Sequence, residues 1–285
     1  LRGTRETILS SSLGDHSRYH GGVLAEHHLL VKERLDVVPG ISAYHYSDMG
    51  WRAWPGLDIG FKLTEKLKLY ASGGSSFRLP SYTELYMDHP VLKGDPSLPL
   101  GEARAAEGGV RYRRDGLSAT GAAFRREGSS VIDWIIDGQS GVQSVRERKI
   151  TVNGGEATVD VEINRLFAAI PVPTLSLDYA FLDYDFDATP GGTSKYLDNP
   201  VQHQAGVTVV LSPLPWLKNT WHASFEQLLN GDNYTIVDTR LAVKYRLFGA
   251  FVEATNLLDV PYYDNGWVRM PGRRLRTGAE LAIAW

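Results

Sequence analysis

Three carboxylates alternate along one stretch of the sequence, in the manner of the first oxygen ligands of a calcium-binding loop. Asp183, Asp185 and Asp187 stand at every second position, as the first ligands of an EF-hand do. An EF-hand also needs glycine at its sixth position and a bidentate glutamate at its twelfth. Ala188 and Ser194 occupy those positions. We therefore interpret the segment as a solvated acidic loop and expect no metal site there.

No other combination of residues indicates catalysis or a bound cofactor. The 285 residues include no cysteine, which excludes thiol nucleophiles, zinc fingers and disulfide frameworks. His27 and His28 are adjacent on an expected strand, so they point to opposite faces and cannot share a metal ion. The serines at 10–12 lack the context of a nucleophile elbow, and no phosphate-binding glycine loop is present. We expect no enzyme, no cofactor and, with a net charge of −3, no nucleic-acid partner.

The elements that must position any binding residue are β-strands, because the dominant period of the sequence is two. Leu57, Ile59 and Phe61, for example, alternate with Asp58 and Gly60. The same alternation recurs along the chain, and no segment of comparable length keeps a helical period. Fourteen strands are predicted: 1–10, 19–31, 34–47, 55–63, 66–77, 102–113, 116–136, 145–166, 173–185, 201–211, 216–228, 233–246, 249–257 and 273–285.

The connections between these strands alternate between short and long. Short ones are expected at 32–33, 64–65, 114–115, 167–172, 212–215 and 247–248, and longer ones at 11–18, 48–54, 78–101, 137–144, 186–200, 229–232 and 258–272. Bacterial outer-membrane barrels are built this way, with an apolar exterior and a polar interior. Aromatic residues near strand ends are typical of interfacial girdles, and here they are Trp51, Trp54, Trp216 and Tyr245. The final strand ends on Trp285.

A series of short motifs resembles the TonB-dependent outer-membrane receptors. The stretch SFRLPSYTELY at 76–86 resembles their FRAP…ELY motif, and GDPSLPLGE at 94–102 resembles GNPxLxPE. Further along, AEGGVR at 106–111 resembles a strand with the pattern xExG, and VIDWI at 131–135 resembles xIDWI. YLDNP at 196–200, NLLD at 256–259 with Tyr262, and MPGR at 270–273 complete the series in family order. The resemblance covers residues 70–285.

This resemblance implies an all-β fold, an antiparallel transmembrane β-barrel in which this chain supplies about 14 of about 22 strands. Residues 1–285 are then one domain, the C-terminal part of the barrel. No segment resembling the family's plug domain is visible, so the chain is interpreted as a fragment or truncated form. The implied location is the outer membrane of a Gram-negative bacterium, in contact with its lipid.

The implied function is the active uptake of a scarce nutrient, a ferric siderophore, cobalamin or haem, with energy from TonB. The implied partners are a metal-chelate or corrinoid-type ligand, the plug domain and the TonB complex. The alternative is a complete 14-stranded passive porin, and a second rival is a soluble β-domain. The arginine and proline of the FRAP-like motif, and the Pro271-Gly272 pair, are expected to have structural roles.

In this family the extracellular loops bind ligand, which makes the aromatic and ionisable residues of the long connections the candidates. These are Tyr82, Tyr86, Asp88, His89, Tyr184, Asp185, Asp187, Tyr234, Tyr262, Tyr263 and Trp267. His89 lies between the first two motifs, as a histidine does in some haem receptors, although a solvated loop histidine is the favoured interpretation. Three charged residues are expected to face the lumen and the plug: Glu102, Glu107 and Arg111.

Overall fold

The computed structural model describes residues 2–166, 173–187, 189, 191–264 and 268–282. Within these residues the chain is built almost wholly of β-strands, and fourteen of them have eight or more residues. The long strands are β1 (Arg2–Ser10), β2 (Gly14–Glu26), β4 (Leu35–Tyr46), β5 (Gly50–Lys62), β6 (Leu67–Arg78), β9 (Gly101–Arg114), β10 (Leu117–Asp137), β11 (Gln143–Val161), β12 (Thr174–Phe186), β14 (Val201–Leu214), β15 (Leu217–Leu228), β16 (Asn233–Tyr245), β17 (Phe248–Thr255) and β20 (Arg274–Leu281). The predicted all-β class and the fourteen strands are therefore confirmed.

Six short strands and two short helices decorate the connections among the described residues. The strands are β3 (Leu29–Val31), β7 (Asp88–His89), β8 (Leu92–Lys93), β13 (Gly192–Ser194), β18 (Tyr263–Asp264) and β19 (Val268–Arg269), and the helices are α1 (Tyr82–Tyr86) and α2 (Ile163–Leu166). Neighbouring long strands pair antiparallel, and 18 strands belong to one sheet. The described helices include none that is long and apolar enough to cross a membrane.

Several predicted boundaries are wrong. The strand expected at 19–31 is broken at 27–28, between β2 and β3, so His27 and His28 do not lie within a strand. β2 begins at Gly14 and β5 begins at Gly50, so the expected long connections 11–18 and 48–54 shrink to turns at 11–13 and 47–49. Both glycines have a positive φ, 83° and 71°, a conformation that glycine adopts without steric cost. The strand expected to run from 145 to 166 ends at Val161, and α2 follows it. The expected short connection at 167–172 and the terminal Trp285 lie outside the described residues.

The chain divides into two compact units. Unit 1 comprises Leu1–Gly109, Ala123–Asn153 and Asp183–Asp198, and unit 2 comprises Val110–Ala122, Gly154–Leu182 and Asn199–Trp285. Strands β9, β10, β11 and β12 therefore contribute one part to each unit.

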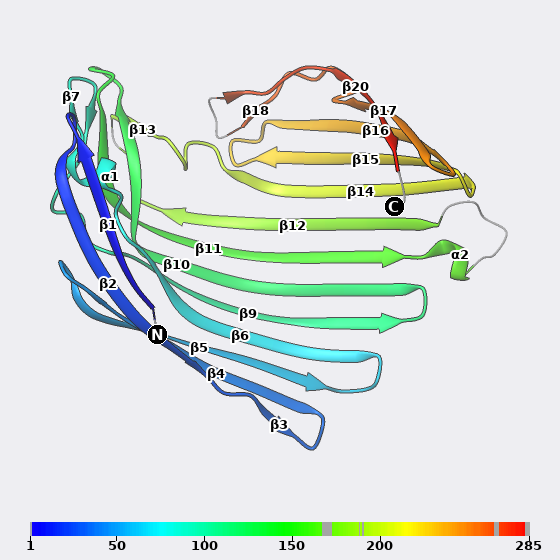
Figure 1. The fold of residues 1–285 in the computed structure, drawn as a ribbon, viewed down its shortest axis with the longest axis horizontal. Coiled ribbons are helices and arrows are strands. Elements are labelled where there is room, and N and C mark those ends of the chain that lie inside the picture. Colours follow the sequence, from blue (N-terminus) through cyan, green and yellow to red (C-terminus); the bar gives the residue numbers. More distant parts are fainter. Residues whose placement is uncertain (1, 167–172, 188, 190, 265–267, 283–285) are drawn as a thin grey trace. The chain divides into compact units, whose positions relative to one another are not determined.

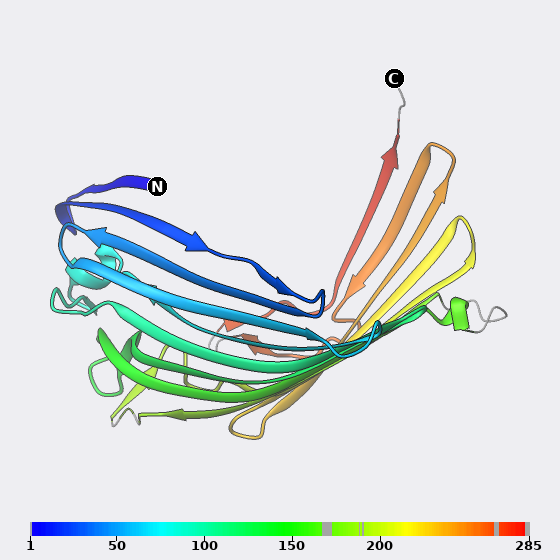
Figure 2. The ribbon, with the colours of Figure 1, turned by 90° about the horizontal axis from the view of Figure 1, so that it is seen from below.

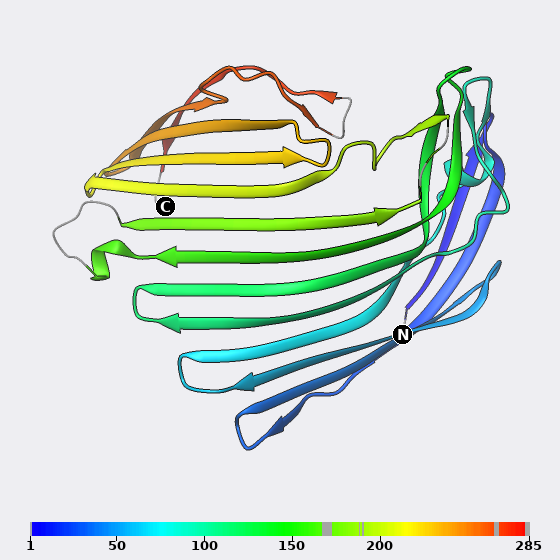
Figure 3. The same ribbon diagram turned by 180° about the vertical axis from the view of Figure 1, so that it is seen from behind.

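Unit 2 is a sheet with one apolar and one polar face. Strand register aligns Leu177, Val207, Ala223 and Val237 in one row across β12, β14, β15 and β16, which lie side by side in Figure 3. Residues in such a row share a face, and apolar members of this face such as Leu177 and Val207 are exposed. The opposite face carries polar contacts: Thr208 with His222, and Glu253 with Arg240 and Arg276.

Unit 1 shows the same division but adds two buried clusters on top of its sheet. On β5, the apolar residues Leu57, Ile59 and Phe61 are exposed along one face. The first cluster joins Tyr46, Trp54 and Leu100, and partly buried Phe77 packs against them. The second cluster joins Leu85, Leu98, Ile132, Trp134 and Val145. The expected girdle therefore needs one correction, because Trp54 is buried in a cluster, whereas Trp51, Trp216 and Tyr245 lie at strand ends and are exposed.

Candidate functional site

The longest connection, 79–100, is folded into a compact structure by one carboxylate. Ser81 caps α1, its hydroxyl accepting from the Glu84 backbone N–H, and the Glu84 carboxylate accepts from the Ser81 N–H at 2.8 Å in return. Arg78 donates to both carboxylate oxygens of Glu84, at 2.9 and 2.8 Å. Burial alone would raise the pKa of Glu84, but the hydrogen bonds from Arg78 and Ser81 outweigh burial and hold that pKa below its usual value. Arg78 and the buried Pro80 therefore have the structural roles expected for them.

The second half of this connection is a small hairpin, β7–β8, that adds to the edge of β11. Leu92 and Lys93 of β8 pair in parallel with Gln143 and Ser144 of β11. Asp88 forms an exposed ion pair with Lys93 at 2.5 Å, and this hydrogen bond lowers the pKa of Asp88. His89 is exposed, and its Nδ1 accepts from a backbone N–H. Asp88 and His89 thus lie together on a solvent-facing hairpin.

Tyr82 and Tyr86 of α1 stack with His16 of β2. The His16 and Tyr86 ring centroids are 3.6 Å apart with an interplanar angle of 7°, and Tyr82 lies 6.0 Å from His16. Figure 2 shows the blue β1–β2 turn beside the cyan α1 helix. The Arg18 guanidinium lies 5.6 Å from the Tyr82 ring centroid and pairs with Asp48 at 2.7 Å. Burial raises the pKa of Tyr82, and Arg18 opposes this shift.

An aromatic floor continues from this stack along the same face of the sheet. The His20 and Tyr46 ring centroids are 5.5 Å apart, and the next contact along the floor joins Tyr46 to Phe77. Trp54 and Phe77 stack at 3.6 Å with an interplanar angle of 16°. These rings, a buried guanidinium and two histidines form one packed group, which we call the aromatic–cationic patch: His16, Arg18, His20, Tyr46, Trp54, Phe77, Tyr82 and Tyr86. Arg18, Tyr46 and Trp54 are buried, and the other five members are half-buried. The half-buried rings suit a ligand with planar aromatic groups.

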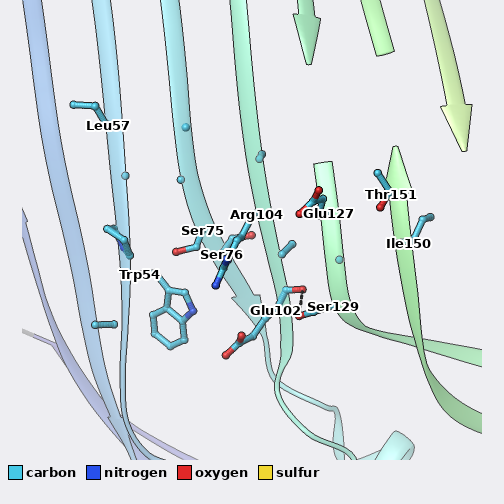
Figure 4. Close-up of a pocket in the computed structure, with 18 of the residues that line it drawn as sticks. Trp54, Leu57, Ser75, Ser76, Glu102, Arg104, Glu127, Ser129, Ile150 and Thr151 are labelled. Atoms are coloured by element: carbon cyan, nitrogen blue, oxygen red, sulfur yellow. Dashed lines mark hydrogen bonds between the residues drawn. The ribbon is translucent and has the colours of Figure 1, made fainter. Parts of the chain in front are cut away.

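Beside the patch lies a hollow of about 990 Å³ lined by β5, β6, β9, β10 and β11 (Figure 4). Small residues of β6 and β9, including Gly73, Gly74 and Ala103, leave this space open. Its charged lining residues are Glu102, Arg104, Glu127 and Lys149. Ser129 donates to the backbone oxygen of Glu102 at 3.5 Å. Glu102 thus lines this hollow, whereas Glu107 is half-buried further along β9, and Arg111 belongs to unit 2.

A third group of predicted residues ends β12 and leads into a buried polar core. Tyr184 and Asp185 are among the last residues of the strand, and the backbone oxygen of Asp187 accepts a hydrogen bond from Arg148. Arg148 also pairs with Asp133 at 3.2 Å, and the two side chains are 6% and 1% exposed. Asp133 is the acidic residue of the VIDWI motif, so this motif builds a buried ion pair. No group of three or more metal-ligating side chains occurs in the described parts of the chain.

The remaining candidates lie in unit 2, around the connection 256–273. The Tyr234 and Tyr262 rings are 5.1 Å apart, and the Tyr234 hydroxyl donates to Glu226. Tyr263 is exposed in β18, and Trp267 lies outside the described residues. Asn256 organises the connection by bonding the backbone of Val260 twice, each time at 2.9 Å.

Sequence reasoning singled out two of the eight members of the aromatic–cationic patch as site residues, Tyr82 and Tyr86. His16 and Arg18 fell in the expected connection 11–18. On the polar face of a sheet, however, a run of charged residues at alternate positions is the signal of a strand. His16, Arg18 and His20 show that alternation, as do Tyr44 and Tyr46.

The sequence and the structure were compared with those of known proteins. No curated protein matches the sequence. The siderophore receptor PirA from Pseudomonas aeruginosa superposes with a TM-score of 0.77 at 17% identity, over 98% of this chain and 50% of that one. A mutant of the ferric enterobactin receptor PfeA from the same organism gives 0.75 at 15%, over 94% and 45%.

The FrpB iron transporter from Neisseria meningitidis gives a TM-score of 0.71 at 13% identity, over 93% of this chain and 45% of that one. These likenesses establish the fold, and the chain spans about half the length of these structures. The family model described as "TonB dependent receptor-like, beta-barrel" matches residues 9–270. The chain therefore belongs to the TonB-dependent receptor β-barrel family.

Proposed function

We propose that this chain forms part of the wall and ligand-binding surface of an outer-membrane receptor for a metal chelate. The family match over residues 9–270 carries this proposal. The structural neighbours include a siderophore receptor and a ferric enterobactin receptor, which favours a ferric siderophore over cobalamin or haem. In the whole protein, uptake would draw energy from the TonB complex through a plug domain.

The exposed apolar face supports placement of the sheet in lipid. On β5 this face runs from Trp51 to Phe61, ten residues further along. Ten steps of about 3.3 Å on a strand tilted by about 45° rise about 23 Å along the membrane normal. The apolar band of an outer-membrane barrel is about 25 Å tall. An interfacial tryptophan at one end of such a stretch is what a lipid-facing strand requires.

The aromatic–cationic patch supports an aromatic chelate as the ligand. Arg18 is only 3% exposed and its charge is paired with Asp48, so its role is to hold the Tyr82 ring, which lies 5.6 Å from its guanidinium. Tyr82 and Tyr86 offer ring faces beside it. A passive porin would need no such arrangement, and the family assignment does not favour the porin alternative.

Equilibrium binding to the full-length receptor in detergent tests this proposal. Quenching of tryptophan fluorescence is measured with a ferric catecholate, a ferric hydroxamate, haem and cobalamin. We expect a ferric chelate to bind, and Arg18→Ala to weaken that binding about 10- to 100-fold, because the charge-assisted bond to Asp48 and the contact that holds the Tyr82 ring are lost. Arg52→Ala removes an exposed arginine of β5 whose guanidinium bonds only a neighbouring carbonyl among the described contacts, and it should leave binding unchanged. Binding of cobalamin alone, or of none of the four, would contradict the proposal.

A further inference from the structure

Residues 191–197 form a strap that returns across the end of β10. β13 pairs antiparallel with β10, placing Ser194 opposite Ile135 and Thr193 opposite Ile136. The Lys195 N–H donates to the Trp134 oxygen at 2.9 Å, and the Gly138 N–H donates to the Gly191 oxygen at 2.9 Å. Figure 1 shows β13 beside β10 at the end where α1 and β7 also lie. The strap is thus an extra strand added to a strand end.

A buried polar group lies under the strap and contacts Ser194 within it and Asp187 before it. Asp133 accepts from Arg148 at 3.2 Å and from the Ser194 hydroxyl at 2.6 Å, through the same oxygen. The second Nη of Arg148 donates to the Asp187 backbone oxygen, where the chain enters the loop. Ser194 in turn accepts from the backbone N–H of Leu197 at 2.7 Å. One ion pair between β10 and β11 therefore contacts the strap at Ser194 and the end of the preceding strand segment at Asp187.

The strap presents an aromatic and a cation beside the folded connection 79–100. Tyr196 is exposed, the Lys195 ammonium lies 5.5 Å from its ring centroid, and Arg78 lies within electrostatic range of the Tyr196 side chain. Three pairs of facing residues, Ile135 to Asp137 with Gly192 to Ser194, are too short a ladder to be stable alone in water. Something besides the ladder must fix the position of Tyr196.

We propose that the Asp133–Arg148 pair is a clamp that fixes the strap, so that Lys195 and Tyr196 form a preorganised wall of the extracellular ligand surface. The consequence for the ligand surface rests on the proposed function, but the clamp itself does not. Removing one member of a buried ion pair leaves the other charge uncompensated, which is strongly destabilising. The exposed Arg125–Glu127 pair on the same β10 strand has no such penalty.

Hydrogen exchange of the full-length receptor in detergent, followed by mass spectrometry without any ligand, tests the clamp. In Arg148→Met we expect the amides of Lys195, Tyr196 and Leu197 to exchange about 100-fold faster, because local opening no longer breaks the pair. Ser194→Ala removes the bond to Asp133 and also the acceptor of the Tyr196 and Leu197 N–H groups. The readout for this variant is therefore the Lys195 amide, which bonds the Trp134 oxygen and should exchange about 10-fold faster. Arg125→Met is the matched control and should leave the strap unchanged.

A designed disulfide distinguishes a clamp from general damage to the fold. Ile136 and Thr193 face each other across an antiparallel pair, a spacing that accommodates a disulfide, and the chain has no other cysteine. Ile136→Cys with Thr193→Cys, oxidised in the Arg148→Met background, should restore slow exchange, and reduction should abolish the rescue. Unchanged exchange in both Arg148→Met and Ser194→Ala, or failure of the oxidised lock to rescue, would overturn the clamp. Because no ligand is present, either result is independent of whether the proposed function is correct.

Discussion

A single arginine placed on the apolar face of unit 2 should distinguish lipid contact from water contact. Val207 is six residues from the start of β14 and seven from its end. At about 3.3 Å per residue and a tilt of about 45°, these steps place it about 14 Å and about 16 Å from the two ends along the membrane normal. Val207 is therefore close to the bilayer midplane if the apolar face meets lipid.

Val207→Arg should then cost about 2–4 kcal/mol of folding free energy, the penalty for arginine at the midplane of a barrel exterior. The matched control is Ser224→Arg on the opposite face. Ser224 pairs with Gly206, the residue beside Val207, so the depth is the same, and the Asp178 carboxylate lies over this glycine as a partner for the new arginine. A polar interior accepts this arginine, and we expect a change of less than about 0.5 kcal/mol.

Denaturant titration of the full-length receptor in phospholipid vesicles, followed by tryptophan fluorescence, measures both variants. The expected result is a lower midpoint for Val207→Arg at an unchanged slope, with Ser224→Arg close to wild type. Equal destabilisation of the two variants would refute the assignment of the faces. The opposite order would indicate a soluble β-domain whose apolar face is internal.

Three further changes test local features. Asn256→Ala should destabilise the connection 256–273 by about 2–4 kcal/mol. Two hydrogen bonds to Val260 are lost, and alanine tolerates the backbone φ of 47° less well than asparagine does. Limited proteolysis should cut this connection first. Trp54→Ala should cost about 3–5 kcal/mol as a buried aromatic deletion, whereas Trp51→Ala, 65% exposed, should cost much less; thermal unfolding compares them. Glu84 has a lowered pKa, so its stabilisation is present above its ordinary pKa of about 4.3 and is lost as the pH falls through the ordinary and lowered values. Glu84→Gln should therefore flatten the stability curve between about pH 5 and pH 2, and an unchanged curve would contradict this role.

The strands were predictable because alternation is a local property of the sequence. Leu57, Ile59 and Phe61 reveal β5 without any knowledge of its neighbours. The early boundaries of β2 and β5 were missed for the opposite reason. Arg18 is charged, which is typical of a loop, and Trp54 is a large aromatic residue, which is typical of a membrane interface. Both are nevertheless buried in the structure. Their burial depends on α1 and on Phe77, which no local pattern places nearby.

The candidate site was predictable in part. The motifs drew attention to Tyr82 and Tyr86. In the structure both rings stack with His16, a residue that the motifs did not include. The VIDWI motif contains Asp133, but nothing in the sequence indicated a role for its side chain. Its partner Arg148 is on the next strand, and its second contact, Ser194, lies 61 residues away. Contacts of this kind are set by tertiary packing, which the sequence period does not encode.

The central claim is tested most directly by uptake of a radioiron-labelled ferric siderophore into cells that carry the full-length receptor as their only siderophore receptor. Uptake is compared between cells with and without a functional TonB protein. We predict accumulation that depends on TonB and falls with Arg18→Ala. Accumulation that proceeds equally without TonB would indicate a passive pore and contradict the account.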